Sequence, residues 1–158
     1  MDITIEHLAP ERFFAFGWII EHDGRAGRCY HPQVLSKHAA QFWLNNPKAK
    51  LRLPYAMTRL ERHPYSTQCF LPLTGARYLA VACPSRTDGT PDEKNLCAFD
   101  VCAPTGIAFR EGVWHHGLLV YDTPASFAVI MGNGARTETE FFEMTQNIQL
   151  VEPLHATR

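Results

Sequence analysis

Two short runs that are typical of β-strands follow each other within residues 67–83, which read TQCFLPLTGARYLAVAC. The runs at 67–73 and 77–83 are rich in aromatic and aliphatic residues and have the length of ordinary strands. Gly75 lies between them and marks a turn. This stretch therefore predicts two neighbouring strands within an all-β framework.

Runs of the same kind recur along the rest of the chain, each bounded by proline or glycine. They predict further strands at residues 51–60, 96–101, 117–121, 126–131 and 141–151. Residues 84–94 are rich in Pro, Gly, Ser and Asp and lie between two predicted strands, so we expect a long hairpin connection there. Many short strands with few helices indicate a β-sandwich or a barrel, formed by one domain over residues 1–158.

Helix signals are sparse. Residues 10–15 predict a short helix, because Pro10 suits a first turn and Gly17 can end the element. Residues 36–43 predict a second one, with Ser36 as the N-cap. Both helices are expected at the periphery of the β-structure.

Charge and cysteine usage restrict the partners and the compartment. Fifteen basic and sixteen acidic residues give a formal charge of -1, which argues against nucleic acid or an anionic membrane as the main partner. The apolar runs are too short to span a bilayer, and the N-terminus lacks the pattern of a secretory signal. An odd set of five cysteines without CxxC pairs favours a reducing, cytoplasmic compartment.

Two histidine clusters carry the chemistry that can be inferred from spacing. In an extended segment Glu61 and His63 point to the same face, and Gln68 can stand beside them from the next strand. Further along, His115 and His116 follow Gly112, and adjacent strand residues must face opposite sides. Structural polar residues are the alternative to a shared functional site, and spacing alone leaves both open.

These clusters are similar to the two metal-binding motifs of cupins. Glu61-x-His63 takes the positions of the paired histidines, Gln68 the position of the Glu, and His115 that of the last histidine. More specifically, residues 60–64, 67–73 and 112–118, together with 91–99, resemble the ureidoglycolate lyase family.

The resemblance implies a cupin-like β-barrel or jelly roll, a homodimer, and cleavage of ureidoglycolate into glyoxylate and urea with a divalent metal. Glu61, His63 and His115 are then the candidate catalytic residues, and the same three with Gln68 are candidate ligands for Ni, Mn, Fe or Zn. The small carboxylate substrate needs a cationic partner, for which Arg59, Arg62, Arg77 and Arg110 are candidates. The predicted substrate-binding set is Arg110, Gln68 and Trp114.

The chain departs from the family pattern at one informative place. Where the family continues a Phe-x-Val-Ile strand with Asp-Arg-Gly-Gly, this chain has Met131-Gly132-Asn133-Gly134. Two alternatives therefore stay open beside the lyase. One is a cupin enzyme that acts on another small hydroxy or keto acid, and the other is a non-catalytic cupin that binds a small carboxylate.

Overall fold

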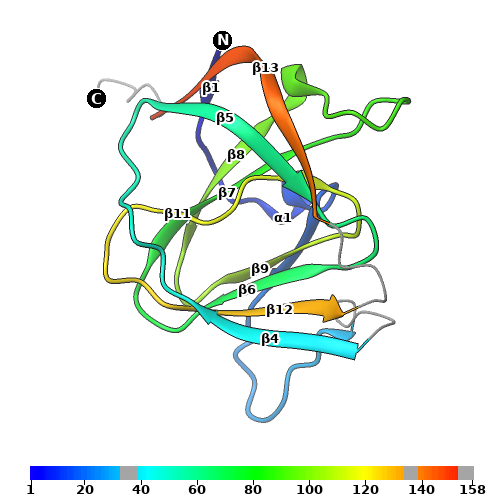
Figure 1. Ribbon diagram of the computed structural model, residues 1–158. Helices are drawn as coiled ribbons and strands as arrows, with labels where there is room; N and C mark the ends of the chain where they lie inside the picture. Colours follow the sequence, from blue (N-terminus) through cyan, green and yellow to red (C-terminus); the bar gives the residue numbers. More distant parts are fainter. Residues whose placement is uncertain (33–38, 134–138, 153–158) are drawn as a thin grey trace.

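The computed structural model describes residues 1–32, 39–133 and 139–152, and it consists mainly of two β-sheets that face each other (Figure 1). One sheet has the order β1-β13-β5-β10-β7-β8-β2, with β11 paired to β7, and the other has the order β3-β9-β6-β12-β4. The strands are β1 Asp2–Thr4, β2 Glu6–His7, β3 Gly17–Ile20, β4 Ala39–Asn45, β5 Tyr55–Arg62, β6 Gln68–Pro72, β7 Arg77–Cys83, β8 Cys97–Cys102, β9 Gly106–Phe109, β10 Trp114–His115, β11 Leu119–Val120, β12 Phe127–Asn133 and β13 Glu140–Val151. The predicted cupin-like barrel is confirmed.

The position of strand β7 between two cores explains why its sequence is an almost unbroken apolar run. Its side chains alternate between two cores, so that Tyr78 and Ala80 contribute to the core between the sheets. Leu79 and Val81 contribute to a second core on the other side of the strand, which also contains residues of β5 and β13. Because both faces of β7 are covered, every residue from Tyr78 to Cys83 is buried.

The smaller sheet is packed closely at β9, which lies between β3 and β6. A Cβ atom at Gly17 would lie only 1.9 Å from the carbonyl oxygen of Ala108, so only glycine fits where β3 passes β9. The inner side of this sheet carries Phe70, Ile107 and Phe109 into the core between the sheets.

The first predicted helix is confirmed and the second is wrong. Helix α1 spans Pro10–Phe13 with proline in its first turn. Residues 36–38 lie outside the described residues, but Ala39–Asn45 form strand β4, paired antiparallel to β12 over its whole length. Trp43 packs against the core while its neighbours Phe42 and Leu44 are exposed, which is the period of a strand and not of a helix.

The predicted hairpin connection at 84–94 is also confirmed, since it joins the antiparallel strands β7 and β8 and leads into the 3-10 helix η2, Glu93–Asn95. The carboxylate of Glu93 is fully buried and accepts hydrogen bonds from Thr145 N, Thr145 Oγ1 and Gln146 N. These bonds hold the irregular part of β13, where the register with β5 shifts between Glu143 and Ile148. Within the described part of the chain, no helix has the length and apolar character needed to cross a membrane.

Candidate active site

The candidate site forms where β5, β10 and β6 approach one another. Strand β10 pairs with β5, which places His115 directly opposite Glu61. Strand β6 belongs to the other sheet and pairs with β9, where Gln68 is opposite Phe109. The two predicted motifs, far apart in the sequence, are therefore brought together across the inside of the barrel.

His115 is the centre of this group and is almost completely buried. Its Nε2 lies 3.0 Å from Gln68 Oε1 and 3.7 Å from Glu61 Oε1, and its Nδ1 lies 2.8 Å from the carbonyl oxygen of Val113. The ring stacks on Phe109, with centroids 4.4 Å apart and an angle of 17° between the planes. The imidazole is thus fixed in orientation from two sides.

Burial keeps His115 neutral, because it lowers the pKa of this residue to about 3. A neutral imidazole that donates from Nδ1 to the Val113 carbonyl presents a lone pair at Nε2. The carbonyl oxygen of Gln68 cannot donate to that lone pair, so either the amide turns its NH₂ group toward His115 or a cation occupies the space between them. His115 is therefore oriented as a ligand or as a hydrogen-bond acceptor.

His63 contributes a second buried imidazole, whose centroid lies 5.2 Å from that of His115. Its Nδ1 lies 3.3 Å from Thr139 Oγ1, whereas its Nε2 is buried without a hydrogen-bond partner among the described residues. Burial lowers the pKa of His63, and the nearby Gln68 side chain opposes this shift. An unpaired buried nitrogen is costly unless something binds it.

The residues present fit a divalent metal ion. One potential ligand atom from each of Glu61, His63 and His115 lies within 4.8 Å of the others. The unpaired Nε2 of His63 and the lone pair of His115 both suit an ion, and a Val113 carbonyl behind a histidine ligand is a common supporting contact. A set of imidazole, carboxylate and amide groups without thiolates is typical of an exchangeable site for a borderline metal.

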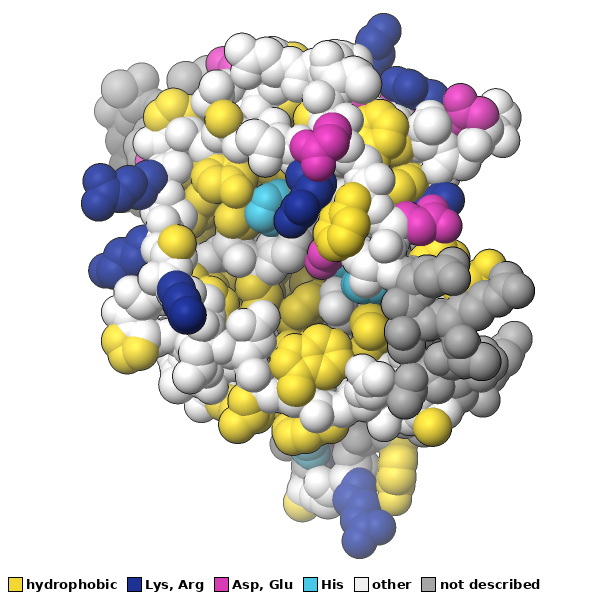
Figure 2. All heavy atoms as spheres, viewed as in Figure 1, with side chains coloured by type: hydrophobic (Ala, Val, Ile, Leu, Met, Phe, Trp, Pro, Cys, Tyr) yellow, Lys and Arg dark blue, Asp and Glu magenta, His cyan; other side chains and the backbone are white. Residues whose placement is uncertain are grey.

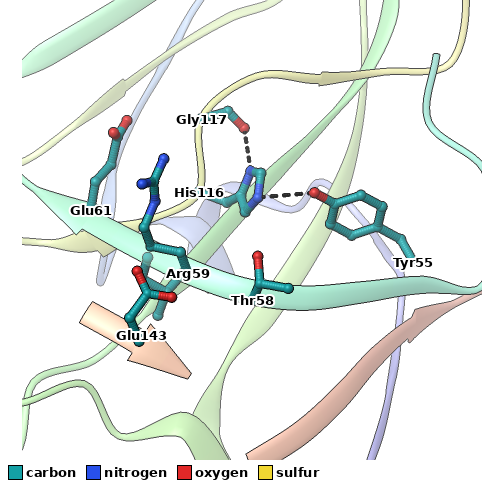
Figure 3. A pocket seen from close by; sticks show the side chains of 8 residues that line it. Tyr55, Thr58, Arg59, Glu61, His116, Gly117 and Glu143 are labelled. Carbon is teal, nitrogen blue, oxygen red and sulfur yellow. Dashed lines mark hydrogen bonds between the residues drawn. The ribbon is translucent and has the colours of Figure 1, made fainter. Parts of the chain in front are cut away.

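A pocket of about 370 Å³ opens beside this group, and Glu61 belongs to both (Figure 3). In the pocket, His116 Nδ1 lies 2.9 Å from the carbonyl oxygen of Gly117, so the ring accepts at Nε2 from the Tyr55 hydroxyl, 3.3 Å away. The complete lining is Tyr55, Thr58, Arg59, Leu60, Glu61, His116, Gly117 and Glu143. In the view of Figure 2, histidine, basic and acidic side chains gather over β5, above a hollow with hydrophobic side chains in its depth.

The adjacent histidines do face different surroundings, as strand alternation predicts. His115 lies in the buried group, and His116 lines the open pocket beside Tyr55. Burial raises the pKa of Glu61, while the positive charge of Arg59 opposes this shift. The raised pKa makes the Glu61 carboxylate a stronger base than a solvent-exposed one, which suits a group that accepts a proton.

The structure does not bring Arg110 or Trp114 into the group. The guanidinium of Arg110 lies over the rings of Phe14 and Trp18 and donates to the Phe14 carbonyl oxygen over 2.8 Å. The side chain of Trp114 lies on the opposite face of β10 from that of His115 and packs in the second core. The guanidinium carbon of Arg62 lies 4.5 Å from the centre of the Trp114 ring.

Sequence reasoning missed the pocket residues Tyr55 and His116 as possible substrate contacts. A signal was present, because Tyr55, Arg59 and Glu61 are separated by even numbers of residues within one strand. The contribution of His116 depends on the pairing of β10 with β5, which no local pattern reveals.

Comparisons with known proteins decide the family. A family model described as ureidoglycolate lyase matches residues 1–151. This chain belongs to the ureidoglycolate lyase family. The ureidoglycolate lyase of Stutzerimonas stutzeri (strain A1501) is 31% identical over 170 residues, covering 99% of this chain and 98% of the relative. That of Burkholderia mallei (strain NCTC 10229) is 37% identical over 144 residues, covering 84% and 83%.

Membership in the ureidoglycolate lyase family confirms the relationship that the motifs around Glu61, His63 and His115 predict. Among solved structures, RmlC from Streptococcus suis in complex with dTDP-D-xylose is similar, with 15% identity and a TM-score of 0.44. That similarity covers 61% of this chain and 45% of the other one.

Proposed function

We propose that this chain cleaves ureidoglycolate into glyoxylate and urea, and that Glu61, His63, Gln68 and His115 form its active site. The main support is that the family match spans residues 1–151 and that these four side chains converge on one buried point beside an open pocket. Relatives that cover nearly the whole chain carry the name ureidoglycolate lyase.

The reaction requires one proton to move between two atoms of the substrate. Ureidoglycolate has one carbon that bears a hydroxyl group, a carboxylate and the urea nitrogen. The O–H and C–N bonds break, the C=O bond of glyoxylate forms, and the leaving nitrogen takes up a proton to give urea. A positioned acid–base group contributes roughly 10²–10⁴-fold to such a transfer.

Glu61 is the residue that we assign to this proton transfer. It borders the pocket and the buried histidines, and burial raises its pKa, which makes the carboxylate a stronger base. Glu61 takes the hydroxyl proton and returns it to the leaving nitrogen, so that the atoms balance without a second acid. His63 and His115 stay neutral because burial lowers their pKa values, and they orient the reacting hydroxyl group.

A divalent ion such as Ni, Mn, Fe or Zn fits this proposal, with Glu61, His63, Gln68 and His115 as the residues that would hold it. Such an ion, when bound, lowers the pKa of the substrate hydroxyl and helps to position the substrate. The carboxamide of Gln68 is the weakest member of the set and also orients His115.

We also propose that the protein is a cytoplasmic homodimer. Strand β4 lies at the end of its sheet, and its side chains Phe42 and Leu44 are about two-thirds exposed, with fractions of 64% and 61%. An apolar edge of this kind favours pairing with a second copy. All five cysteines are free thiols, which supports a reducing compartment.

One observation favours a second candidate function, action on a different small hydroxy or keto acid. Met131 takes the place of the family Asp and lies opposite Gln68 in the pairing of β12 with β6. The Gln68 amide nitrogen is 3.8 Å from the Met131 sulfur, so a thioether borders the buried group where the family has a carboxylate.

The other alternative, a non-catalytic carboxylate-binding protein, would show ligand binding without any product.

The experiment that tests the proposed function measures urea and glyoxylate release from ureidoglycolate by the purified protein. The protein is first treated with a chelator and then supplied with single divalent metals. We expect release well above the spontaneous rate, with the highest rate in the presence of one of these metals. Release that is independent of metal would retain the lyase, with Glu61 as the acid–base group and the other three residues as groups that orient the substrate. No release under any condition would refute the lyase.

A further inference from the structure

We propose that Arg59, in the pocket beside the buried histidines, is the residue that binds the substrate carboxylate. This inference rests on the proposed function, because it takes the substrate to be a small acid with its reacting carbon near Glu61. In this role Arg59 takes the place of Arg110, the arginine that the sequence analysis favours. The charge of Arg59 would make the pocket selective for acids over neutral ureido compounds.

The other arginines of the candidate set are already engaged. Arg62 donates to Glu140 Oε2 over 2.7 Å and to the carbonyl oxygen of Gly89 over 2.9 Å. Arg77 forms a two-pronged ion pair with Asp100. Arg110 donates to the Phe14 carbonyl oxygen from two nitrogens.

Arg59 differs from them in contacts and in position. Among the described residues its guanidinium forms no hydrogen bond and no ion pair, although it stacks over the Phe141 ring at 4.5 Å. It is the one Arg or Lys residue in the described lining of the pocket. An exposed guanidinium with free donors that is held against an aromatic ring is well suited to bind a carboxylate through two parallel hydrogen bonds.

The neighbours of Arg59 place a carboxylate next to the reacting group. The side chain extends between Glu61 and His116 in Figure 3, and its charge acts on both residues. Ureidoglycolate carries its carboxylate and its hydroxyl on the same carbon. A carboxylate held by Arg59 therefore brings the hydroxyl group to the side of Glu61, as the proposed proton transfer requires.

The remaining pocket groups suit the ureido end of the substrate. Glu143 is paired in register with Arg59, and its carboxylate can accept hydrogen bonds from ureido N–H groups. The Tyr55 oxygen, whose proton is directed to His116, can accept another. Because Glu61 and Glu143 repel an anion, Arg59 is the part of this pocket at which a carboxylate is attracted.

The test uses ureidoacetate, which has hydrogen in place of the reacting hydroxyl group and cannot follow the proposed route, and its neutral amide, ureidoacetamide. Binding of both compounds is measured by calorimetry for the wild type and for R59M, R59K and R110M. The matched control is R52M, which removes the same charge from an exposed residue outside the pocket. Thermal unfolding of each variant shows that it is folded.

We expect the wild type and R52M to prefer ureidoacetate over the amide, and R59M to lose roughly 10- to 100-fold in affinity for the acid alone. R59K should recover part of the preference, since lysine restores the charge but not the paired donors. In turnover, R59M should raise KM more than it lowers kcat.

Two results would overturn the assignment of Arg59: a wild-type protein that does not bind ureidoacetate more tightly than the amide, or loss of the preference in R110M and not in R59M. The test remains separate from that of the proposed function. An Arg59-dependent preference for the acid in a protein that does not cleave ureidoglycolate would support the carboxylate site and refute only the lyase.

Discussion

The ring of His115 lies on the ring of Phe109, with centroids 4.4 Å apart and planes 17° from parallel. Phe109 belongs to the core between the sheets, so this contact couples a ligand-type histidine to the packing of the barrel. Together with the bond from Nδ1 to Val113, the contact fixes the direction of the His115 lone pair before any ligand arrives.

Replacement of Phe109 should therefore weaken metal binding as well as stability. We expect F109L and the control F127L, both at buried core positions, to lose similar stability, about 1 kcal/mol. Only F109L should lower the affinity for a divalent ion, roughly 10-fold, because Phe127 packs on Tyr78 and not on His115. Chelator competition with Zn or Ni measures this affinity, and an equal loss in both variants would contradict the coupling.

The residue at position 131 should control the charge of the site. We expect M131D to bind a divalent ion about 10-fold more tightly than the wild type, since a carboxylate would then face the Gln68 side of the histidine pair. The neutral variant M131L is the control and should leave metal affinity unchanged. If M131D and M131L bind metal alike, this position does not face the ion.

Glu93 should be essential for stability although it lies outside the candidate site. E93Q replaces a fully buried carboxylate oxygen by an NH₂ group that faces the N–H donors of Thr145 and Gln146. We expect a loss of roughly 2–4 kcal/mol in the free energy of unfolding, measured by urea denaturation. The exposed Glu111 provides the control, and E111Q should cost under about 0.5 kcal/mol.

The thiols should differ strongly in reactivity. Burial raises the pKa of Cys83 to about 12, so at pH 8 almost none of it is thiolate, whereas Cys102 is exposed. We expect iodoacetamide to modify Cys102 within minutes and Cys83 only after unfolding, as read by mass spectrometry of peptides. Rapid modification of Cys83 in the folded protein would mean that β7 opens far more easily than its burial implies.

Local sequence patterns are sufficient to predict the central strands and part of the candidate site. The apolar run of β7 and the even spacing of Glu61 and His63 are local properties of the sequence, and the structure contains the strand and brings the two side chains together. For strand β4 the local signal misleads, because Ser36 is a typical N-cap residue and predicts a helix over residues 36–43. Pairing with β12 decides its conformation, and that pairing is not encoded locally.

For a related reason, the sequence alone could not predict which arginine lines the pocket. Arg59 and Arg110 have the same chemistry, and each lies close in sequence to a motif histidine. The contact of Arg110 with Phe14 and the position of Arg59 beside Glu61 follow from tertiary packing. Only the folded chain shows which guanidinium is free.

The glyoxylate release rate of E61Q shows whether the carboxylate of Glu61 carries the proton in the cleavage of ureidoglycolate. Glutamine keeps the size of the side chain and removes the base, so folding and pocket shape should persist. We predict that the catalysed rate falls roughly 10²–10⁴-fold, while thermal unfolding stays cooperative. A rate within about 2-fold of the wild type would exclude Glu61 as the proton carrier and assign the chemistry to other residues.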